Sequence, residues 1–157
     1  MVKVSFYIAR HGNWWDKLIA FKSAPWRMKL TGAFLDLPSH CELVLEEWDD
    51  GKATCFSSSP RDGGCRYKVI DISSGHWQVV PVRGVNRKRV LQQCRLDDGR
   101  GYDWVGAILN AGFRLPFQSR SRLWCSEQNG RALGLQYYRV TPYELMLTLQ
   151  KRRDHVI

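Results

Sequence analysis

Apolar side chains occupy every second position over residues 2–8, the period of a half-buried β-strand. Two further strand-like segments, 40–47 and 53–58, flank a turn that contains Asp50-Gly51. An Asp-Gly pair between two such segments is typical of a β-hairpin. These segments therefore predict an antiparallel β meander or barrel in the first half of the chain.

The remaining elements follow from the same criteria. Segment 58–64 has the composition of a loop, and segment 23–39 is expected to be irregular. Thr141 and Glu144 form a predicted capping box around Pro142, a proline at the first helical position. We expect further strands at 66–70 and 76–82, and helices at 13–22, 90–94, 102–109, 123–133 and 142–152. Strands followed mainly by helices indicate an α+β fold, and we assign residues 1–157 to a single domain.

The chain is strongly basic, with a net charge of +9 over 157 residues. Such a charge suits acidic partners, including an anionic envelope polymer, a membrane surface or nucleic acid. The basic residues are dispersed, however, with short runs only at 86–89 and 151–153. A solvated basic surface is one interpretation and an anion-binding face is the other. Specific nucleic-acid binding is not expected, because no recognition motif is present.

The residue pattern predicts neither export nor insertion into a membrane. No apolar stretch approaches the ~20 residues that span a bilayer. The N-terminal segment has the pattern of a strand and not of a signal peptide. Five cysteines without regular spacing argue against a disulfide framework and favour a reducing compartment. We therefore expect a cytoplasmic protein.

Cys125 lies at the start of the predicted helix 123–133. Unpaired amides and the helix dipole at such a position favour a thiolate, and the same amides can hold an oxyanion. The alternative is a buried structural cysteine, which is the commonest role of a cysteine with no partner.

His40 opens the strand that follows Pro38, and Glu42 lies two residues further on, on the same face. A histidine and a carboxylate in this relationship can be a general base and the group that orients it. The alternative is a solvent-facing pair on an edge strand.

Together these segments resemble the circularly permuted NlpC-type papain-like hydrolases. The resemblance is carried by Ser-His-x-Glu at 39–42, Tyr102-Asp103, and Cys-Ser-Glu at 125–127, with the histidine before the cysteine. That group includes the YiiX-like proteins and is related to the lecithin:retinol acyltransferase group. The Ser/Gly-rich segment 56–64 and the Thr141-Pro142 helix resemble those of bacteriophage-encoded members. The expected compartment of such a member is the host cytoplasm. The resemblance covers residues 38–149.

The resemblance implies that Cys125 is the nucleophile and His40 the base. Relatives generally take the third residue from the next strand, which here offers Thr54, Ser57 and Ser59 but no acid. Local geometry favours Glu42 as the orienter, with Ser57 or Ser59 as alternatives, and a tight turn would place Ser59 opposite Glu42. Tyr102, Ser59 and Trp124 are expected to contact substrate. Tyr102 either shapes the oxyanion site or packs in the core.

The expected reaction is hydrolysis of an amide or peptide bond through a cysteinyl acyl-enzyme, with no cofactor and no metal. Cell-wall (murein-type) peptides and isopeptides are the first substrate classes. A lipid acyltransferase or esterase is the enzymatic alternative and would need an apolar groove and membrane affinity. Two interpretations without catalysis are an inactive basic binding module and a basic nucleic-acid-binding protein.

The remaining cysteines and histidines carry no recognisable chemistry. Cys41 lies on the opposite strand face from His40 and is expected to be core. Cys55, Cys65 and Cys94 have no metal-ligand spacing with one another or with the other histidines. No phosphate-binding glycine loop is present either.

Overall fold

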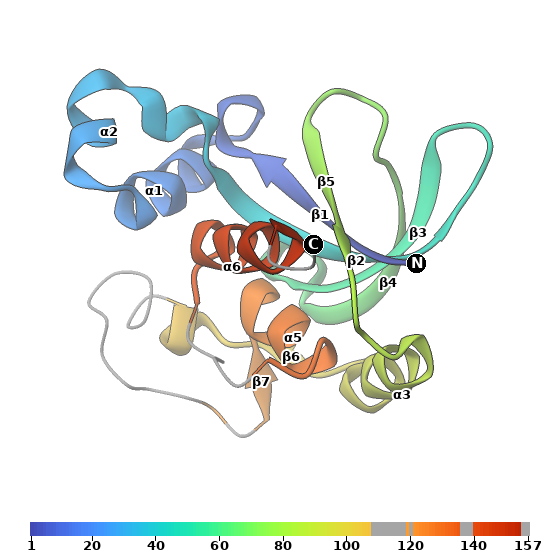
Figure 1. Cartoon of the computed structure of the whole chain (residues 1–157). Helices are drawn as coiled ribbons and strands as arrows, with labels where there is room; N and C mark the ends of the chain where they lie inside the picture. The colour runs from blue at the N-terminus through green and yellow to red at the C-terminus, as the bar shows by residue number, and fades with distance from the viewer. Residues whose placement is uncertain (108–118, 120, 136–139, 155–157) are drawn as a thin grey trace.

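The computed structural model describes residues 1–107, 119, 121–135 and 140–154 (Figure 1). Within these residues a curled seven-stranded sheet has the order β5-β1-β2-β3-β4-β6-β7. The strands are β1 Val2–Ile8, β2 Pro38–Glu47, β3 Lys52–Ser59, β4 Gly64–Asp71, β5 Trp77–Val82, β6 Gly101–Tyr102 and β7 Arg122–Leu123. The α-helices are α1 Trp14–Ser23, α2 Trp26–Thr31, α3 Arg87–Asp97, α5 Cys125–Ala132 and α6 Pro142–Asp154. The predicted α+β class is confirmed.

The sheet departs from a simple meander at both edges. Strands β1 to β4 pair antiparallel in chain order, but β5 crosses over to pair with β1, with Val2 opposite Val82. Strands β6 and β7 pair in parallel beyond β4. Gly64 is required at that junction, because a Cβ there would meet the Arg100 carbonyl oxygen at 2.0 Å. The expected antiparallel meander therefore describes β1 to β4. β5 pairs with β1 instead of following β4, and β6 and β7 pair in parallel, because pairing at the edges depends on long-range packing.

Helices with strong local start signals begin where the sequence predicts. The Asn13 side chain accepts hydrogen bonds from the amides of the first turn of α1, and Asp16 completes a capping box. Thr141 and Glu144 cap α6 in the same reciprocal way. Both caps satisfy amides that otherwise have no intrahelical partner.

Three expected boundaries are corrected. The segment expected to be irregular contains α2, which starts after Pro25 and stops at Gly32, where φ is +74°. Tyr102 lies in β6 and not in a helix, and helical geometry covers 104–107 among the described residues. The rest of the expected helix 102–109 lies outside them. Leu123 belongs to β7, so α5 begins at Cys125 and not at Leu123.

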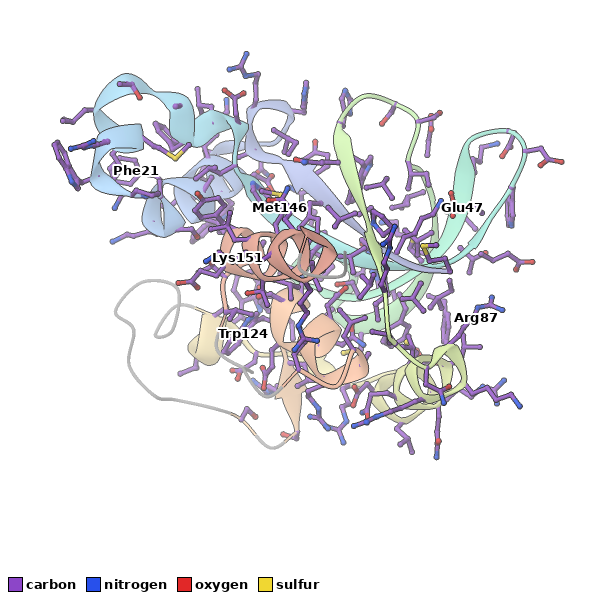
Figure 2. The ribbon with its side chains drawn as sticks, in the orientation of Figure 1. Phe21, Glu47, Arg87, Trp124, Met146 and Lys151 are labelled. Carbon is purple, nitrogen blue, oxygen red and sulfur yellow. The ribbon has the colours of Figure 1, made fainter. Side chains whose placement is uncertain are left out.

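The main core lies between the sheet and the helices α5 and α6, which pack against β2 (Figure 1). Met146 of α6 points toward this core, as Figure 2 shows. Phe6, Leu43 and Phe56 of the sheet are fully buried there, together with Leu145 and Leu149 of α6. No helix in the described part of the chain is long and apolar enough to cross a membrane. The helix that carries Cys125 is thus fixed against the central strand that carries His40.

Candidate active site

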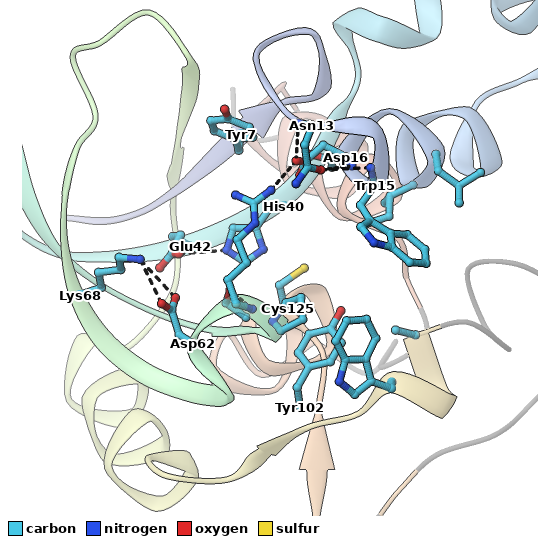
Figure 3. Close-up of a pocket in the computed structure, with 18 of the residues that line it drawn as sticks. Tyr7, Asn13, Trp15, Asp16, His40, Glu42, Asp62, Lys68, Tyr102 and Cys125 are labelled. Atoms are coloured by element: carbon cyan, nitrogen blue, oxygen red, sulfur yellow. Dashed lines mark hydrogen bonds and ion pairs between the residues drawn. The ribbon is translucent and has the colours of Figure 1, made fainter.

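Cys125 and His40 come together where the start of α5 meets β2. Cys125 is the first residue of α5, and Trp124 precedes it in extended geometry without a side-chain cap. The amides of the first turn of α5 are therefore free of a capping side chain. The Cys125 sulfur lies close enough to the His40 ring that each group shifts the pKa of the other, although the two residues are 85 positions apart in sequence. Figure 3 shows the Cys125 sulfur beside this ring.

Glu42 holds the other side of the imidazole. His40 Nε2 lies 2.9 Å from Glu42 Oε1, which leaves Nδ1 as the ring nitrogen for the thiol. Only 1 % of Glu42 is exposed, and a buried carboxylate needs a positive partner. Arg66 of β4 supplies it, donating hydrogen bonds of 2.8 and 3.0 Å to the two carboxylate oxygens. Arg66 in turn donates to Asp62 at 2.6 Å.

These contacts shift the pKa values of the pair in opposite directions. Burial disfavours the imidazolium, but the Cys125 thiolate and the Glu42 carboxylate outweigh it and raise the pKa of His40 to about 10. A hydrogen bond from the Cys41 thiol, together with the positive His40 ring, lowers the pKa of Cys125 well below its ordinary value despite burial. Both shifts favour the thiolate and imidazolium form of the pair.

Cys41 is the functional neighbour that sequence reasoning missed. It is fully buried in the core, as expected, but it also adjoins Cys125 and helps to lower the pKa of that thiol. Burial, and then the neighbouring Cys125, raise the pKa of Cys41 well above its ordinary value, so its thiol keeps its proton. Strand alternation assigns Cys41 to the core face, and no sequence signal indicates that Cys125 approaches it from that side.

A cavity of about 620 Å³ opens beside the pair and is lined by both Cys125 and His40 (Figure 3). Tyr102 and Ser59 line it, as expected of substrate-contacting residues. Trp124 instead lines a smaller neighbouring cavity of about 50 Å³ that also reaches Cys125. Most of the accessible lining of the large cavity is apolar, with aromatic and aliphatic contributions from α1 and β5. The reactive pair therefore adjoins a space suited to an apolar group.

The serines of β3 do not take the place of Glu42. Ser57 Oγ donates to the Cys41 carbonyl oxygen at 2.6 Å, and Ser59 Oγ accepts from the Arg61 amide. Leu43 pairs with Phe56, so the register continues with Ser57, and not Ser59, beside Glu42. The expected pairing of Ser59 with Glu42 is wrong for two reasons. The turn, closed by the Trp48 N–H on the Lys52 carbonyl oxygen, is one residue longer than a tight Asp50-Gly51 turn, and a bulge between Val44 and Glu46 shifts the register by one more residue.

The described residues contain no group of three or more His, Cys, Asp and Glu side chains that could hold a metal ion. Comparison of the chain with protein-family models, curated proteins and solved structures found no match. The interpretation of the site accordingly rests on its own geometry.

Proposed function

We propose that the protein is a thiol-dependent hydrolase that cleaves an amide or peptide bond through a cysteinyl acyl-enzyme. The observation that carries this proposal is the buried series Cys125–His40–Glu42, in which the Cys125 sulfur adjoins the His40 ring and that ring bonds to Glu42, beside a large cavity. A nucleophile, a base and a group that orients the base are the parts that such a reaction needs. An inactive binding module would have no need for this arrangement.

In the proposed mechanism the Cys125 thiolate attacks the carbonyl carbon of the substrate and forms a tetrahedral intermediate. Its oxyanion accepts a hydrogen bond from the Cys125 amide at the start of α5. Tyr102 lines the same cavity, and burial raises the pKa of its hydroxyl, which therefore stays protonated and able to donate. The His40 imidazolium protonates the leaving amine as the carbon–nitrogen bond breaks. His40 then takes a proton from water, which attacks the thioester and releases the acid.

We propose that the protein belongs with the permuted papain-like hydrolases. A helix that begins with cysteine packs against a strand that carries histidine near its start, and the histidine comes first in sequence. The departure from the family pattern is the third residue, which comes from the histidine's own strand. The five cysteines form no disulfide with one another, which accords with a reducing, cytoplasmic setting.

The cavity favours a second acyl donor within the same chemistry. Trp15, Leu18 and Ile19 of α1 and Trp77 of β5 line it, and they would accommodate the hydrocarbon chain of a lipid ester or amide. A peptide or isopeptide with an apolar side chain fits the same space. Murein-type peptides stay among the proposed substrates because the basic surface suits an anionic polymer.

Competitive labelling of the five cysteines with iodoacetamide near neutral pH tests the proposal. We expect Cys125 to react faster than the other four, whose accessibility or pKa disfavours the thiolate. His40→Ala should abolish that preference, whereas His76→Ala, at an exposed histidine, should preserve it. Equal labelling of all five would refute the nucleophile assignment. An adduct trapped on Cys125 from a lysate and weighed by mass spectrometry would then identify the acyl group.

A further inference from the structure

The helices α1 and α2 expose an apolar and basic surface at one end of the molecule, away from α3 (Figure 1). Figure 2 shows Phe21 at this end, with Glu47 and Arg87 at the opposite one. Six large apolar side chains here are between 36 and 77 % exposed: Trp14, Trp15, Leu18, Phe21, Trp26 and Leu30. We call this surface the α1–α2 face. Soluble monomers rarely expose so many large apolar side chains together, which indicates an interaction surface.

The helices are apolar on the side where a soluble helix is polar. In α1 the residues that face the protein are small or polar, with Ala20 and Asp16 buried, whereas Trp14 and Phe21 are exposed. The exposed Trp14 and Trp15 rings stack on each other with centroids 4.2 Å apart. Packing against the protein therefore leaves the apolar side of α1 uncovered.

Charge distinguishes what would cover the α1–α2 face. It carries four basic residues: Lys17, Lys22, Arg27 and Lys29. Arg27 lies 5.5 Å from the Trp26 ring centroid, and Lys29 lies 5.0 Å from that of Phe21. Asp16, the acidic residue of α1, is buried and bound to Arg61 and Ser39, so it does not offset these charges at the surface. The exposed charge on this face is positive.

We infer that the α1–α2 face docks on an anionic phospholipid bilayer. Tryptophan, phenylalanine and leucine beside lysine and arginine are the combination that lies in a bilayer interface, with the aromatic rings at headgroup level. A symmetric contact between two copies would bring like charges together. The aliphatic Leu18 and Leu30 offer nothing to stack on nucleic-acid bases. A bilayer satisfies both the apolar and the charged part of the face.

The docked face is continuous with the candidate active site. Trp15 and Leu18 are partly exposed and also line the cavity that contains Cys125 (Figure 3). Docking would place the mouth of this cavity beside the lipid headgroups. The inference concerns binding and does not depend on the proposed hydrolysis, so the two can fail separately.

Sedimentation with vesicles of phosphatidylcholine mixed with phosphatidylglycerol tests the inference, with phosphatidylcholine vesicles alone for comparison. We expect the full chain to bind the mixed vesicles, and to bind less at high salt. The Trp14→Ser/Trp26→Ser variant should lose about tenfold or more in partition coefficient, because two interfacial aromatic rings are removed. Lys17→Gln and Arg27→Gln should each lose about fivefold.

Matched variants lie outside the α1–α2 face. Trp48→Ser removes a tryptophan that is 44 % exposed at the β2–β3 hairpin, and Arg83→Gln with Lys88→Gln removes exposed charges elsewhere. Trp48→Ser, Arg83→Gln and Lys88→Gln should bind the mixed vesicles as the unchanged protein does, and so should Cys125→Ala. Circular dichroism and iodoacetamide labelling of Cys125 would show that Trp14→Ser/Trp26→Ser is folded.

The inference would be overturned if the protein did not bind the mixed vesicles. It would also be overturned if Lys17→Gln and Arg27→Gln weakened binding but Trp14→Ser/Trp26→Ser did not, or if Trp48→Ser weakened binding as much as Trp14→Ser/Trp26→Ser does. Dimerisation that disappears in Trp14→Ser/Trp26→Ser, without vesicle binding, would assign the face to a second copy of the chain. Binding of single-stranded nucleic acid alone would likewise refute a bilayer partner.

Discussion

Arg66 donates two hydrogen bonds to the carboxylate of Glu42, at 2.8 and 3.0 Å, and thereby fixes the group that faces His40. A bidentate guanidinium restrains both oxygens of a carboxylate, so Glu42 has little freedom to rotate away from the imidazole. Arg66 is itself held by Asp62 and by the Ser57 carbonyl oxygen. The orientation of the candidate base therefore depends on strand β4, two strands away from β2.

The first prediction concerns these two hydrogen bonds from Arg66 to Glu42, which we call the Arg66 clamp. Arg66→Met should lower the free energy of unfolding by about 2 to 4 kcal/mol, because it leaves Glu42 buried without its main cationic partner. Arg66→Lys keeps the charge but loses the bidentate hydrogen bonds, so the free energy of unfolding should fall by less than in Arg66→Met. Urea denaturation monitored by fluorescence measures both. Equal free energies of unfolding for Arg66→Met and the unchanged protein would show that the Arg66 clamp does not stabilise the buried Glu42 carboxylate.

The second prediction concerns the effect of Glu42 on His40. The carboxylate helps to raise the pKa of His40 to about 10, so Glu42→Gln should lower it. The alkaline limb of the pH–rate profile for acyl transfer from Cys125 should then move to lower pH. Glu47→Gln, which removes an exposed carboxylate paired with Lys3 at the end of β2, should leave the limb in place.

The third prediction concerns Cys41. Its thiol is the largest cause of the lowered pKa of Cys125, so Cys41→Ala should raise that pKa. The acid limb of iodoacetamide labelling at Cys125 should shift to higher pH, and stability should fall by only about 1 kcal/mol. Cys55→Ala is the matched control, because Cys55 is equally buried but lies in a separate cluster. An unchanged acid limb in Cys41→Ala would show that the His40 ring alone sustains the thiolate.

The fourth prediction concerns stability against pH. The ordinary pKa values are 9.0 for Cys125, which folding lowers, and 6.5 for His40, which folding raises to about 10. Between pH 6.5 and 9 each state holds one proton on the pair, so the contribution of the pair to stability is constant. Below pH 6.5 the unfolded chain takes up a second proton, and the lowered pKa of Cys125 opposes that uptake in the folded chain. Stability should therefore fall as the pH falls, by at most about 1.4 kcal/mol per pH unit.

The double variant Cys125→Ala/His40→Ala provides the comparison for that prediction. It has neither the thiol nor the imidazole, so the pair adds no slope there. Denaturant unfolding of both proteins between pH 5 and 6.5 should therefore give a stability difference that shrinks as the pH falls. A difference that stays constant over this range would mean that no ion pair forms in the folded protein. Above pH 9 the stability contributed by His40 should decline toward pH 10.

The sequence predicts the parts of this fold that short-range rules determine. β1 and the β2–β3 hairpin follow from alternation and an Asp-Gly turn. α1 follows from the helical spacing of its apolar residues, and α6 follows from its capping residues. The proximity of His40 and Glu42 follows from the two-residue period of β2. The crossover of β5 and the two-residue strands β6 and β7 depend on distant packing, and no local pattern specifies them.

Burial of α5 was also beyond sequence reasoning. Four consecutive polar residues, Ser126 to Asn129, are fully buried, contrary to what their polarity predicts. Hydrogen bonds explain part of this burial, since Asn129 donates to the Cys125 carbonyl oxygen at 2.8 Å and Trp124 donates to Ser126 at 3.0 Å. The Arg66 clamp and the Cys41 contact were missed for the same reason, because each joins residues on different elements.

The bulge in β2 separates two regions with different tolerance to change. His40 and Glu42 lie on one side of the irregularity between Val44 and Glu46, and the turn at Asp50-Gly51 lies on the other. Because a bulge absorbs a change in register, lengthening the turn should leave the spacing of the site residues intact. The tip of this hairpin is thus a suitable place to insert a reporter sequence or a second domain, whereas insertion of one residue between Pro38 and Val44 would exchange the two faces of the strand beyond it.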